Sequence, residues 1–388
     1  MITTDSNLTI IKEYKNNEAN IRIYADGTKV RSYDTEYNPV VPESLDVKIT
    51  DYCDRNCEYC HEQSSVQGEH ANYTTVIQRL LDVPNAELAL GGGNPLAHPA
   101  IEHITRVLTT NGNICNITIN ESVSEEDLDL LGKLVKLGYI HGIGVSINDC
   151  QGAHNFKLNA NRKLILSKLP EYYDNVVAHV IAGVHSYNEI GYVLSTYNKV
   201  LILGYKDFGK GVKYKDNHQD SIETNIQYLK NNLWRILHPN YSAVVSFDNL
   251  AIQQLGVSAH FTGDEWGKFY MGDDGKYSMY YDAVEDKYAT SSTNERISAR
   301  RFNSILDFFS RSSKQARIGG HIPKGIECPV IHHGDYIVPK EIVKNLSTFE
   351  ELKKVMHSNY NSNFHSDNMP WNTMAWIKEL CMLLDKRK

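Results

Sequence analysis

Three cysteines lie close together near the start of the chain, in the segment Cys53-Asp-Arg-Asn-Cys57-Glu-Tyr-Cys60. Three thiolates at this spacing suit a soft metal centre, because thiolate sulfur is the preferred ligand of iron–sulfur clusters. Three protein ligands also leave one iron of a 4Fe-4S cube without a protein ligand, and catalysis requires such an open position. The segment therefore predicts a catalytic iron–sulfur centre.

Two other metal sites match part of this segment. The run Cys57-Glu-Tyr-Cys60-His61 fits the C-x-x-C-H pattern of haem attachment, but that attachment belongs to exported proteins and leaves Cys53 unexplained. Structural zinc with His61 as fourth ligand lacks the usual paired spacing, and adjacent Cys60 and His61 would strain a tetrahedral site. Three core cysteines without a ligand would be a rare coincidence. We favour the iron–sulfur interpretation over all three.

The chain around the cysteines alternates between short apolar strands and helical stretches. Six strand–helix units in series imply a parallel sheet with right-handed crossovers, which predicts an α/β fold with a partial (β/α)6 TIM-like barrel. The cysteine segment directly follows the first strand, and ligands of parallel α/β folds bind at the carboxyl ends of strands. The expected strands are 45–49, 87–90, 114–120, 142–148, 175–181 and 199–205.

We expect three regions. Residues 1–44 form an N-terminal extension with a hairpin over 21–33, turning at Asp26-Gly27. Residues 45–215 form the core barrel. Residues 216–388 form a less regular α+β region that closes the open side of the barrel and binds the substrate. The elements expected in this last region are a helix over 221–237, a strand over 243–247, a hairpin turning at Asp274-Gly275, and helices near 295–309 and 371–384.

The composition excludes several functional classes. The 40 basic and 47 acidic side chains give a formal net charge of −7, which offers no electrostatic reason to expect a nucleic-acid partner. No run of about 18 apolar residues occurs, and residues 1–16 lack the apolar core of a signal peptide. We therefore expect a cytoplasmic protein without a membrane partner, in which thiols stay reduced. The remaining cysteines occur singly and predict no second cluster: Cys115, Cys150, Cys328 and Cys381.

The cysteine segment resembles the hallmark of the radical SAM superfamily, C-x-x-x-C-x-aromatic-C after the first barrel strand, with Tyr59 in the aromatic position. The resemblance covers residues 45–205. It implies that Cys53, Cys57 and Cys60 hold a 4Fe-4S cluster whose fourth iron binds S-adenosylmethionine (SAM). It also implies reductive cleavage of SAM to a 5′-deoxyadenosyl radical, which abstracts hydrogen from a substrate, and an electron donor such as a flavodoxin or ferredoxin.

A second segment resembles the same superfamily at the end of the second strand. Gly92-Gly93-Asn94-Pro95 is similar to the family's Gly-Gly-Glu-Pro, in which glycine lets the backbone approach a ligand closely. In the family this edge pairs with the amino group of SAM. Asn94 stands in the Glu position and offers a carbonyl acceptor without the charge. The resemblance therefore implies that Gly92, Gly93 and Asn94 contact SAM.

Polar and small residues at the ends of the next strands carry the resemblance further. Asn120 ends the third strand, and Ser146 and Asn148 end the fourth, where the family holds the ribose and carboxylate of SAM. Ile181 and Gly183 match the family's Gly-x-Ile-x-Gly adenine edge, although the first glycine and the closing glutamate of that segment are replaced. The resemblance implies that these five residues bind SAM.

Three residues outside these motifs are candidates for catalysis or substrate contact. Cys328 lies near several histidines in the sequence, Asp248 follows an expected strand, and Tyr281 lies in the second region. Nearby, residues 271–280 resemble the hairpin that opens an auxiliary-cluster domain in some peptide-modifying radical SAM enzymes, but the cysteines for that cluster are missing.

The sequence leaves three functions open. The first is an enzyme acting on a peptide or on a small polar metabolite; the absence of a large N-terminal domain argues against a leader peptide. The second is an activase that generates a glycyl radical on a partner protein, although activases are usually more compact. The third is a non-catalytic cluster-binding protein, which Asn94 and Ser186 favour because they stand where the family has glutamate.

Overall fold

The computed structural model describes residues 9–34, 36–148, 154–171, 173–237 and 241–316. Their larger sheet has the strand order β10-β9-β8-β7-β6-β5-β4-β11-β12-β13, and neighbouring strands from β10 to β11 all pair in parallel. The first six parallel strands along the chain are β4 (Ser44–Thr50), β5 (Glu87–Gly92), β6 (Ile114–Asn120), β7 (Gly142–Ser146), β8 (Val176–Ile181) and β9 (Lys199–Leu203). The predicted α/β fold with a partial (β/α)6 barrel is confirmed.

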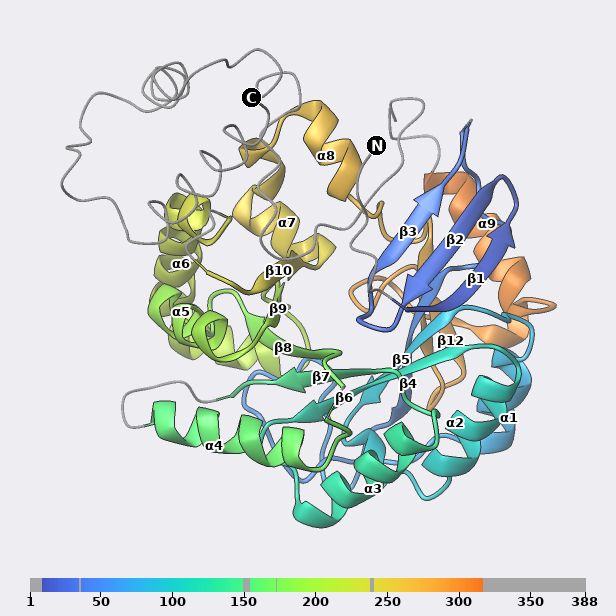
Figure 1. The fold of residues 1–388 in the computed structure, drawn as a ribbon, viewed down its shortest axis with the longest axis horizontal. Coiled ribbons are helices and arrows are strands. Elements are labelled where there is room, and N and C mark those ends of the chain that lie inside the picture. The colour runs from blue at the N-terminus through green and yellow to red at the C-terminus, as the bar shows by residue number, and fades with distance from the viewer. Residues whose placement is uncertain (1–8, 35, 149–153, 172, 238–240, 317–388) are drawn as a thin grey trace, which may run out of the picture. The chain divides into compact units, whose positions relative to one another are not determined.

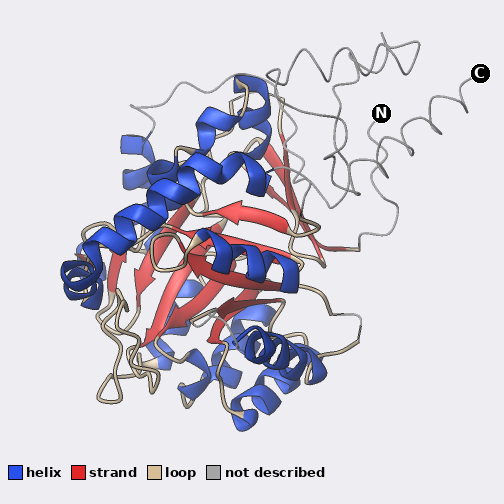
Figure 2. Ribbon diagram, turned by 90° about the vertical axis from the view of Figure 1, so that its left-hand side faces the viewer, coloured by secondary structure: helices blue, strands red, loops and turns tan. Residues whose placement is uncertain are grey.

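One helix follows each of these six strands, and Figures 1 and 2 show the helices on the outer side of the curved sheet. The helix after β9 is longer than the sequence predicts and is kinked at His218, where the backbone leaves helical geometry. None of the described helices is long and apolar enough to cross a membrane. The helices are α1 (Tyr73–Leu80), α2 (Ile101–Thr110), α3 (Glu125–Lys136), α4 (His154–Ser167), α5 (Tyr187–Thr196) and α6 (Lys210–Leu237).

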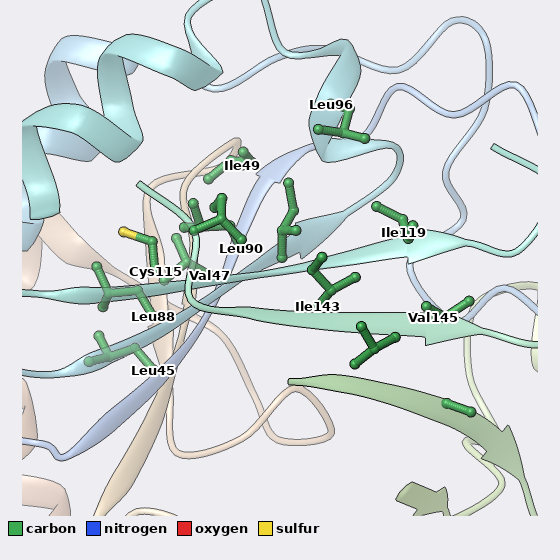
Figure 3. Packing of buried hydrophobic residues seen from close by; sticks show 14 of the residues in the cluster. Leu45, Val47, Ile49, Leu88, Leu90, Leu96, Cys115, Ile119, Ile143 and Val145 are labelled. Atoms are coloured by element: carbon green, nitrogen blue, oxygen red, sulfur yellow. The ribbon is translucent and has the colours of Figure 1, made fainter. Parts of the chain in front are cut away.

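The main core lies between the sheet and these helices, as Figure 3 shows. Alternate residues of a strand face opposite sides of a sheet, and Leu45, Val47 and Ile49 of β4 are all almost completely buried on the helix side. The alternate positions of the same strand, Asp46 and Lys48, are charged. Apolar burial therefore fixes which side of the sheet carries helices, and the polar side faces the inside of the barrel.

Two strands from beyond residue 215 extend the parallel sheet. β10 (Val244–Phe247) pairs with β9, and β11 (Ser278–Asp282) pairs with β4 at the other end of the barrel. The predicted boundary at residue 215 stays a prediction. The other elements of this region are β12 (Lys287–Ala289), β13 (Ile297–Ser298), α7 (Asn249–Leu255), α8 (Gly263–Phe269) and α9 (Ile305–Ala316).

Two expectations for this region were wrong. The turn at Asp274-Gly275 precedes β11 and joins no pair of strands; the hairpin turns instead between β11 and β12, over 283–286. The helix expected near 295–309 begins only at Ile305, because β13 occupies the start of that range. The helix expected over 371–384 lies outside the described residues.

The N-terminal region contains the predicted hairpin, formed by β2 (Ala19–Tyr24) and β3 (Lys29–Ser32), with β1 (Ile10–Asn16) as a third strand. An ion pair joins this sheet to the residue that precedes β4. The Arg31 guanidinium lies 2.9 Å from the carboxylate of Glu43, which has no exposed side-chain surface and also accepts a hydrogen bond from the Tyr37 hydroxyl. The pair fixes the N-terminal sheet against the start of the barrel.

We predict that Arg31→Met lowers the free energy of unfolding by about 3–5 kcal/mol, because it leaves the Glu43 carboxylate buried without its principal partner. The measurement is chemical denaturation followed by circular dichroism. Arg22→Met is the matched control in the same sheet, because the pair of Arg22 with Glu13 is about half exposed and should contribute less than about 1 kcal/mol. Equal losses in the two variants would contradict the role of the buried pair.

Candidate functional site

The cysteines lie on a loop over residues 51–70, called the cysteine loop below, which leaves the carboxyl end of β4 and folds back on itself. The backbone N–H of Cys53 donates to the carbonyl of Ser65 (2.9 Å), and that of Ser65 donates to the carbonyl of Asp51 (3.0 Å). The N–H of Asp51 donates to the carbonyl of Glu69 (2.8 Å). These bonds hold the first cysteine at a fixed distance from the strand end.

The three thiols of the loop are half-buried and lie near one another. Burial raises the pKa of Cys57 to about 11, with contributions from Cys60 and Cys53 because thiolate charges repel. Burial likewise raises the pKa of Cys53, with a contribution from Cys60. A cationic metal centre would relieve this repulsion, because its ligands bind as thiolates. The donor set therefore fits an iron–sulfur cluster.

No three His, Cys, Asp or Glu side chains within the described ranges are grouped about one point as a single metal ion requires. A four-iron cube makes a different demand, because each thiolate binds a different iron and the sulfurs need not converge.

The loop after β5 packs directly on the cysteine loop. The N–H of Gly93 donates to the carbonyl of Thr50 (2.7 Å), and the N–H of Asn94 donates to the carbonyl of Tyr52 (2.7 Å). A Cβ at Gly93 would lie 2.0 Å from the Tyr52 oxygen, and Gly92 has φ +108°. The sequence predicts close approach of this segment to a ligand. The structure shows a close approach to the backbone of the cysteine loop, which by itself requires both glycines.

Asn94 uses both ends of its side-chain amide within the protein. Its Oδ1 accepts from the N–H of Leu96 (3.2 Å) and so caps a short 3-10 turn, Pro95–Ala97. Its Nδ2 donates to Oδ2 of Asp127 (3.1 Å), in the first turn of α3. The predicted acceptor of this residue is therefore already engaged in a local hydrogen bond.

The structure brings Tyr59 and Asn148 together beside Cys57. The Tyr59 hydroxyl donates to Oδ1 of Asn148 (2.9 Å), and the Cys57 Sγ lies 3.9 Å from the same oxygen. The N–H of Asn148 donates to the carboxylate of Glu121 (2.9 Å), which is 5% exposed. The sequence interpretation missed Glu121, although a carboxylate directly after the strand end at Asn120 was a usable signal.

The remaining residues predicted to bind SAM end neighbouring strands as expected, but local contacts engage several of them. Oδ1 of Asn120 accepts from the N–H and the hydroxyl of Ser122. Ser146 ends β7, and its carbonyl accepts from the N–H of Glu121 (3.1 Å). Asn120 therefore makes the turn that its residue type favours. Its predicted contact with SAM stays a prediction.

At the end of β8, the N–H of Ile181 donates to Nδ1 of His185 (3.0 Å). Gly183 has φ +92°, and a Cβ there would lie 2.9 Å from the side chain of Ile222 in α6. Its carbonyl accepts from the side chain of Asn225 (3.0 Å). Packing of α6 accounts for this glycine, and the predicted contact of the two residues with adenine stays a prediction.

Of the three candidates for catalysis or substrate contact, Asp248 and Tyr281 lie within the described residues, and local contacts engage both. Oδ1 of Asp248 caps α7 through the N–H of Ala251 (2.7 Å) and also accepts from the N–H of Gly204 (2.9 Å). Tyr281 is fully buried in the main core, and its hydroxyl donates to Asp286 (3.1 Å), so it has no surface for a substrate. Cys328 lies outside the described residues.

A buried group of charged side chains around Glu62 attaches the cysteine loop to the barrel. Both carboxylate oxygens of Glu62 accept from Arg296 (3.0 and 2.9 Å), and Lys48 Nζ lies 3.2 Å away. Arg296 and Lys48 also pair with the fully buried Asp282. Burial alone would raise the pKa of Glu62, but His61, Lys48 and Arg296 together hold it well below its usual range.

The inner side of the sheet carries a histidine whose ring covers a glycine of the next strand. A Cβ on Gly144 of β7 would lie 2.4 Å from the ring of His179 in β8, so only glycine leaves room for this ring. Burial, together with the positive charge of Lys206, lowers the pKa of His179 to about 4. Nζ of Lys206 lies 3.3 Å from Nε2 of His61 in the cysteine loop. The inside of the barrel is therefore polar next to the thiols.

No protein-family model matches this sequence, and no curated protein matches it. The chain is similar in structure to Streptococcus suis SuiB bound to S-adenosylmethionine, with 15% identity, a TM-score of 0.47 and coverage of 70% of this chain and 66% of that chain. For SuiB bound to the precursor peptide SuiA the values are 14%, 0.48, 70% and 65%. For native anSMEcpe with bound AdoMet and Cp18Cys peptide they are 12%, 0.41, 70% and 80%.

The chain thus spans slightly less than two thirds of the length of SuiB. These distant likenesses assign neither an activity nor a substrate to this chain.

We predict that Gly93→Ala lowers the free energy of unfolding by about 1–3 kcal/mol, because its Cβ would displace the cysteine loop at the Tyr52 carbonyl. Gly91→Ala is the matched control, since a Cβ at Gly91 has no neighbour within 4 Å. Its effect should stay within about 0.5 kcal/mol. Thermal and urea unfolding measure both variants. A Gly93→Ala protein as stable as Gly91→Ala would refute the close approach.

We also predict a pH-dependent contribution from His179. Its folded pKa of about 4 lies below the usual value of about 6.5, so between these values the unfolded chain binds the additional proton. The stability due to neutral His179 is therefore present above about pH 6.5 and is lost as the pH falls through about 4, by up to ~3 kcal/mol.

Urea unfolding of the wild type and of His179→Gln at pH 7, 5.5 and 4.5 tests this contribution, because glutamine does not titrate in this range. We expect the wild type to lose more stability than His179→Gln as the pH falls. His103→Gln, at an exposed position of α2, is the control and should follow the wild type. Parallel pH profiles for the wild type and His179→Gln would exclude a contribution of this size.

Proposed function

We propose that this protein is a radical SAM enzyme in which Cys53, Cys57 and Cys60 hold a 4Fe-4S cluster. The observation that carries the proposal is the placement of three mutually interacting, half-buried thiols at the carboxyl end of β4, in a parallel α/β barrel. When bound, the cluster and SAM would supply the electron and the 5′-deoxyadenosyl radical that abstracts hydrogen from a substrate. The residues of this chain would bind these groups, orient the substrate and exclude water.

Two features next to the cysteines support the binding of SAM at this edge of the barrel. Tyr59 and Asn148 form a hydrogen-bonded pair beside Cys57. The loop with Gly92 and Gly93 is hydrogen-bonded to both strand and loop backbone at the same edge. Because these groups come from three different strand ends, they form one surface around the cysteine loop, where a ligand of the open iron would lie.

The polar residues inside the barrel favour a polar substrate, either a peptide or a small metabolite. Asp46 lies in the middle of β4, between β5 and β11, and places a charged side chain on the inner side of the sheet. Lys206 approaches the same space and influences both Asp46 and His179 electrostatically. A polar substrate in this space would find charged groups available for recognition, and Lys206 also contacts His61 of the cysteine loop.

A non-catalytic cluster-binding protein is the second candidate, favoured by Asn94 in place of glutamate and by the local hydrogen bond of its oxygen. Release of 5′-deoxyadenosine from SAM after anaerobic reconstitution and reduction distinguishes the two. Turnover supports the enzyme, whereas a SAM-binding cluster without turnover supports the second candidate.

We predict that Cys57→Ala loses the cluster and all 5′-deoxyadenosine formation, because the cube then keeps only two protein ligands. Cys115→Ala is the matched control, since Cys115 is fully buried in the main core, away from the cysteine loop. It should keep its iron content and its activity. The measurements are iron and sulfide content, the paramagnetic resonance spectrum of the reduced protein, and the nucleoside product. A Cys57→Ala protein that still cleaves SAM, or a wild type that binds zinc alone, would refute the assignment.

A further inference from the structure

Asn94 stands at the position where a charged residue is expected to meet the amino group of SAM, but it has no charge. Its oxygen accepts from the N–H of Leu96, and its Nδ2 points to the carboxylate of Asp127 (3.1 Å). The amide is therefore held at both ends. A negative charge at this edge of the barrel must come from another residue.

Asp127 is held in place by its own helix. Its N–H donates to the hydroxyl of Ser124 (3.1 Å), the residue that caps α3, so the backbone at Asp127 is fixed relative to the strand end. Its side chain is half-buried. In the part of the chain that the structure describes, no Lys, Arg or His lies within ion-pair distance of Asp127. Among the described residues, the Asp127 carboxylate makes its polar side-chain contact with the Asn94 amide.

The Asn94 amide is neutral, so it brings no opposite charge to the carboxylate of Asp127. Buried or half-buried charges normally have an opposite charge nearby, because desolvation otherwise makes them unfavourable. The positive end of the α3 dipole offsets part of this cost, but a helix terminus supplies only about half an elementary charge. Asp127 thus retains an electrostatic preference for a cation at the edge that Asn94 shares.

We propose that Asp127, positioned by Asn94, supplies the carboxylate that attracts the ammonium group of SAM in this protein. The inference rests on the proposed function, since it assumes that SAM binds at the cysteine loop. One glutamate would supply both a hydrogen-bond acceptor and a negative charge. In this protein the two properties belong to two residues, Asn94 and Asp127. Asn94 acts as a positioning residue, and Asp127 carries the charge.

The test is a charge exchange between the two positions, measured by calorimetric titration of anaerobically reconstituted protein with SAM. Asp127→Asn should weaken SAM binding about tenfold, as expected for loss of a charged hydrogen-bond partner. Asn94→Glu in that background moves the carboxylate to position 94 and should restore the affinity. Glu125→Gln is the matched control, because Glu125 is exposed in the same turn of α3, and its loss removes the same charge.

A second ligand separates an effect on the ammonium group from a general distortion of the site. 5′-Methylthioadenosine lacks the amino-acid part of SAM, so Asp127→Asn should bind it as well as the wild type does. A merely structural role of Asp127 would weaken both ligands equally. Iron content and unfolding temperature, measured on every variant, identify any variant that does not fold.

Three results would overturn the proposal: an unchanged SAM affinity in Asp127→Asn with full iron content, a failure of the double variant to regain affinity, or equal loss of SAM and methylthioadenosine binding. If the wild type takes up no cluster or binds no SAM, the proposed function itself fails, and the role of Asp127 fails with it. A wild type that binds SAM while Asp127→Asn is unaffected leaves the proposed function intact and removes only this inference.

Discussion

The carboxylate of Glu62 attaches the cysteine loop to the rest of the molecule. The Glu62 side chain is 6% exposed, and its carboxylate receives hydrogen bonds or ion pairs from Arg296, Lys48 and Tyr280, which lie far from it in the sequence or on another strand. Burial of so many charges is costly unless each has well-aligned partners, and loss of one partner leaves the others uncompensated. Because Glu62 lies two residues after Cys60, this network restricts where the thiols can lie relative to β4 and β11.

The start of the cysteine loop is held by backbone hydrogen bonds rather than by charge. Gly93 and Asn94 donate their N–H groups to carbonyls at the end of β4 and in the loop, and the missing side chains of the glycines permit that approach. The loop is therefore fixed at Tyr52 by backbone hydrogen bonds and at Glu62 by charged groups. The ion pairs of Glu62 require that every charged partner be present. The backbone hydrogen bonds of Gly93 and Asn94 require only that no Cβ blocks the approach. Together they provide the preorganisation that a metal centre requires.

The two sides of the parallel sheet have different roles in the fold. The side that faces the helices is apolar and supplies the burial that drives folding. The inner side carries Asp46, Lys48 and His179, whose polarity costs stability but creates an environment for a polar ligand. The inner side is tightly packed at Gly144, because the imidazole of His179 on the neighbouring strand occupies the space that a side chain would need.

The sequence alone determined those features that depend on local spacing. The interval between Cys53, Cys57 and Cys60, the alternation of strands and helices, and the hairpin at Asp26-Gly27 all follow from residues within one or two turns of each other. For that reason, the order of the barrel strands and the segment that carries the thiols could be predicted. Glycine at 92 and 93 indicates a close approach of the backbone, but the residue type does not identify the partner, and the predicted contact with SAM stays a prediction.

Only the tertiary structure decided which distant residues meet. Nothing local in the sequence indicates that β11 pairs with β4, or that Arg296 reaches Glu62 across more than two hundred residues. Tyr281 shows the same limit on a smaller scale. Adjacent residues of a strand face opposite sides, so Tyr280 meets Glu62 while Tyr281 lies in the core. Strand pairing sets that phase, and pairing results from cooperative burial of the whole sheet, which no short segment of sequence contains.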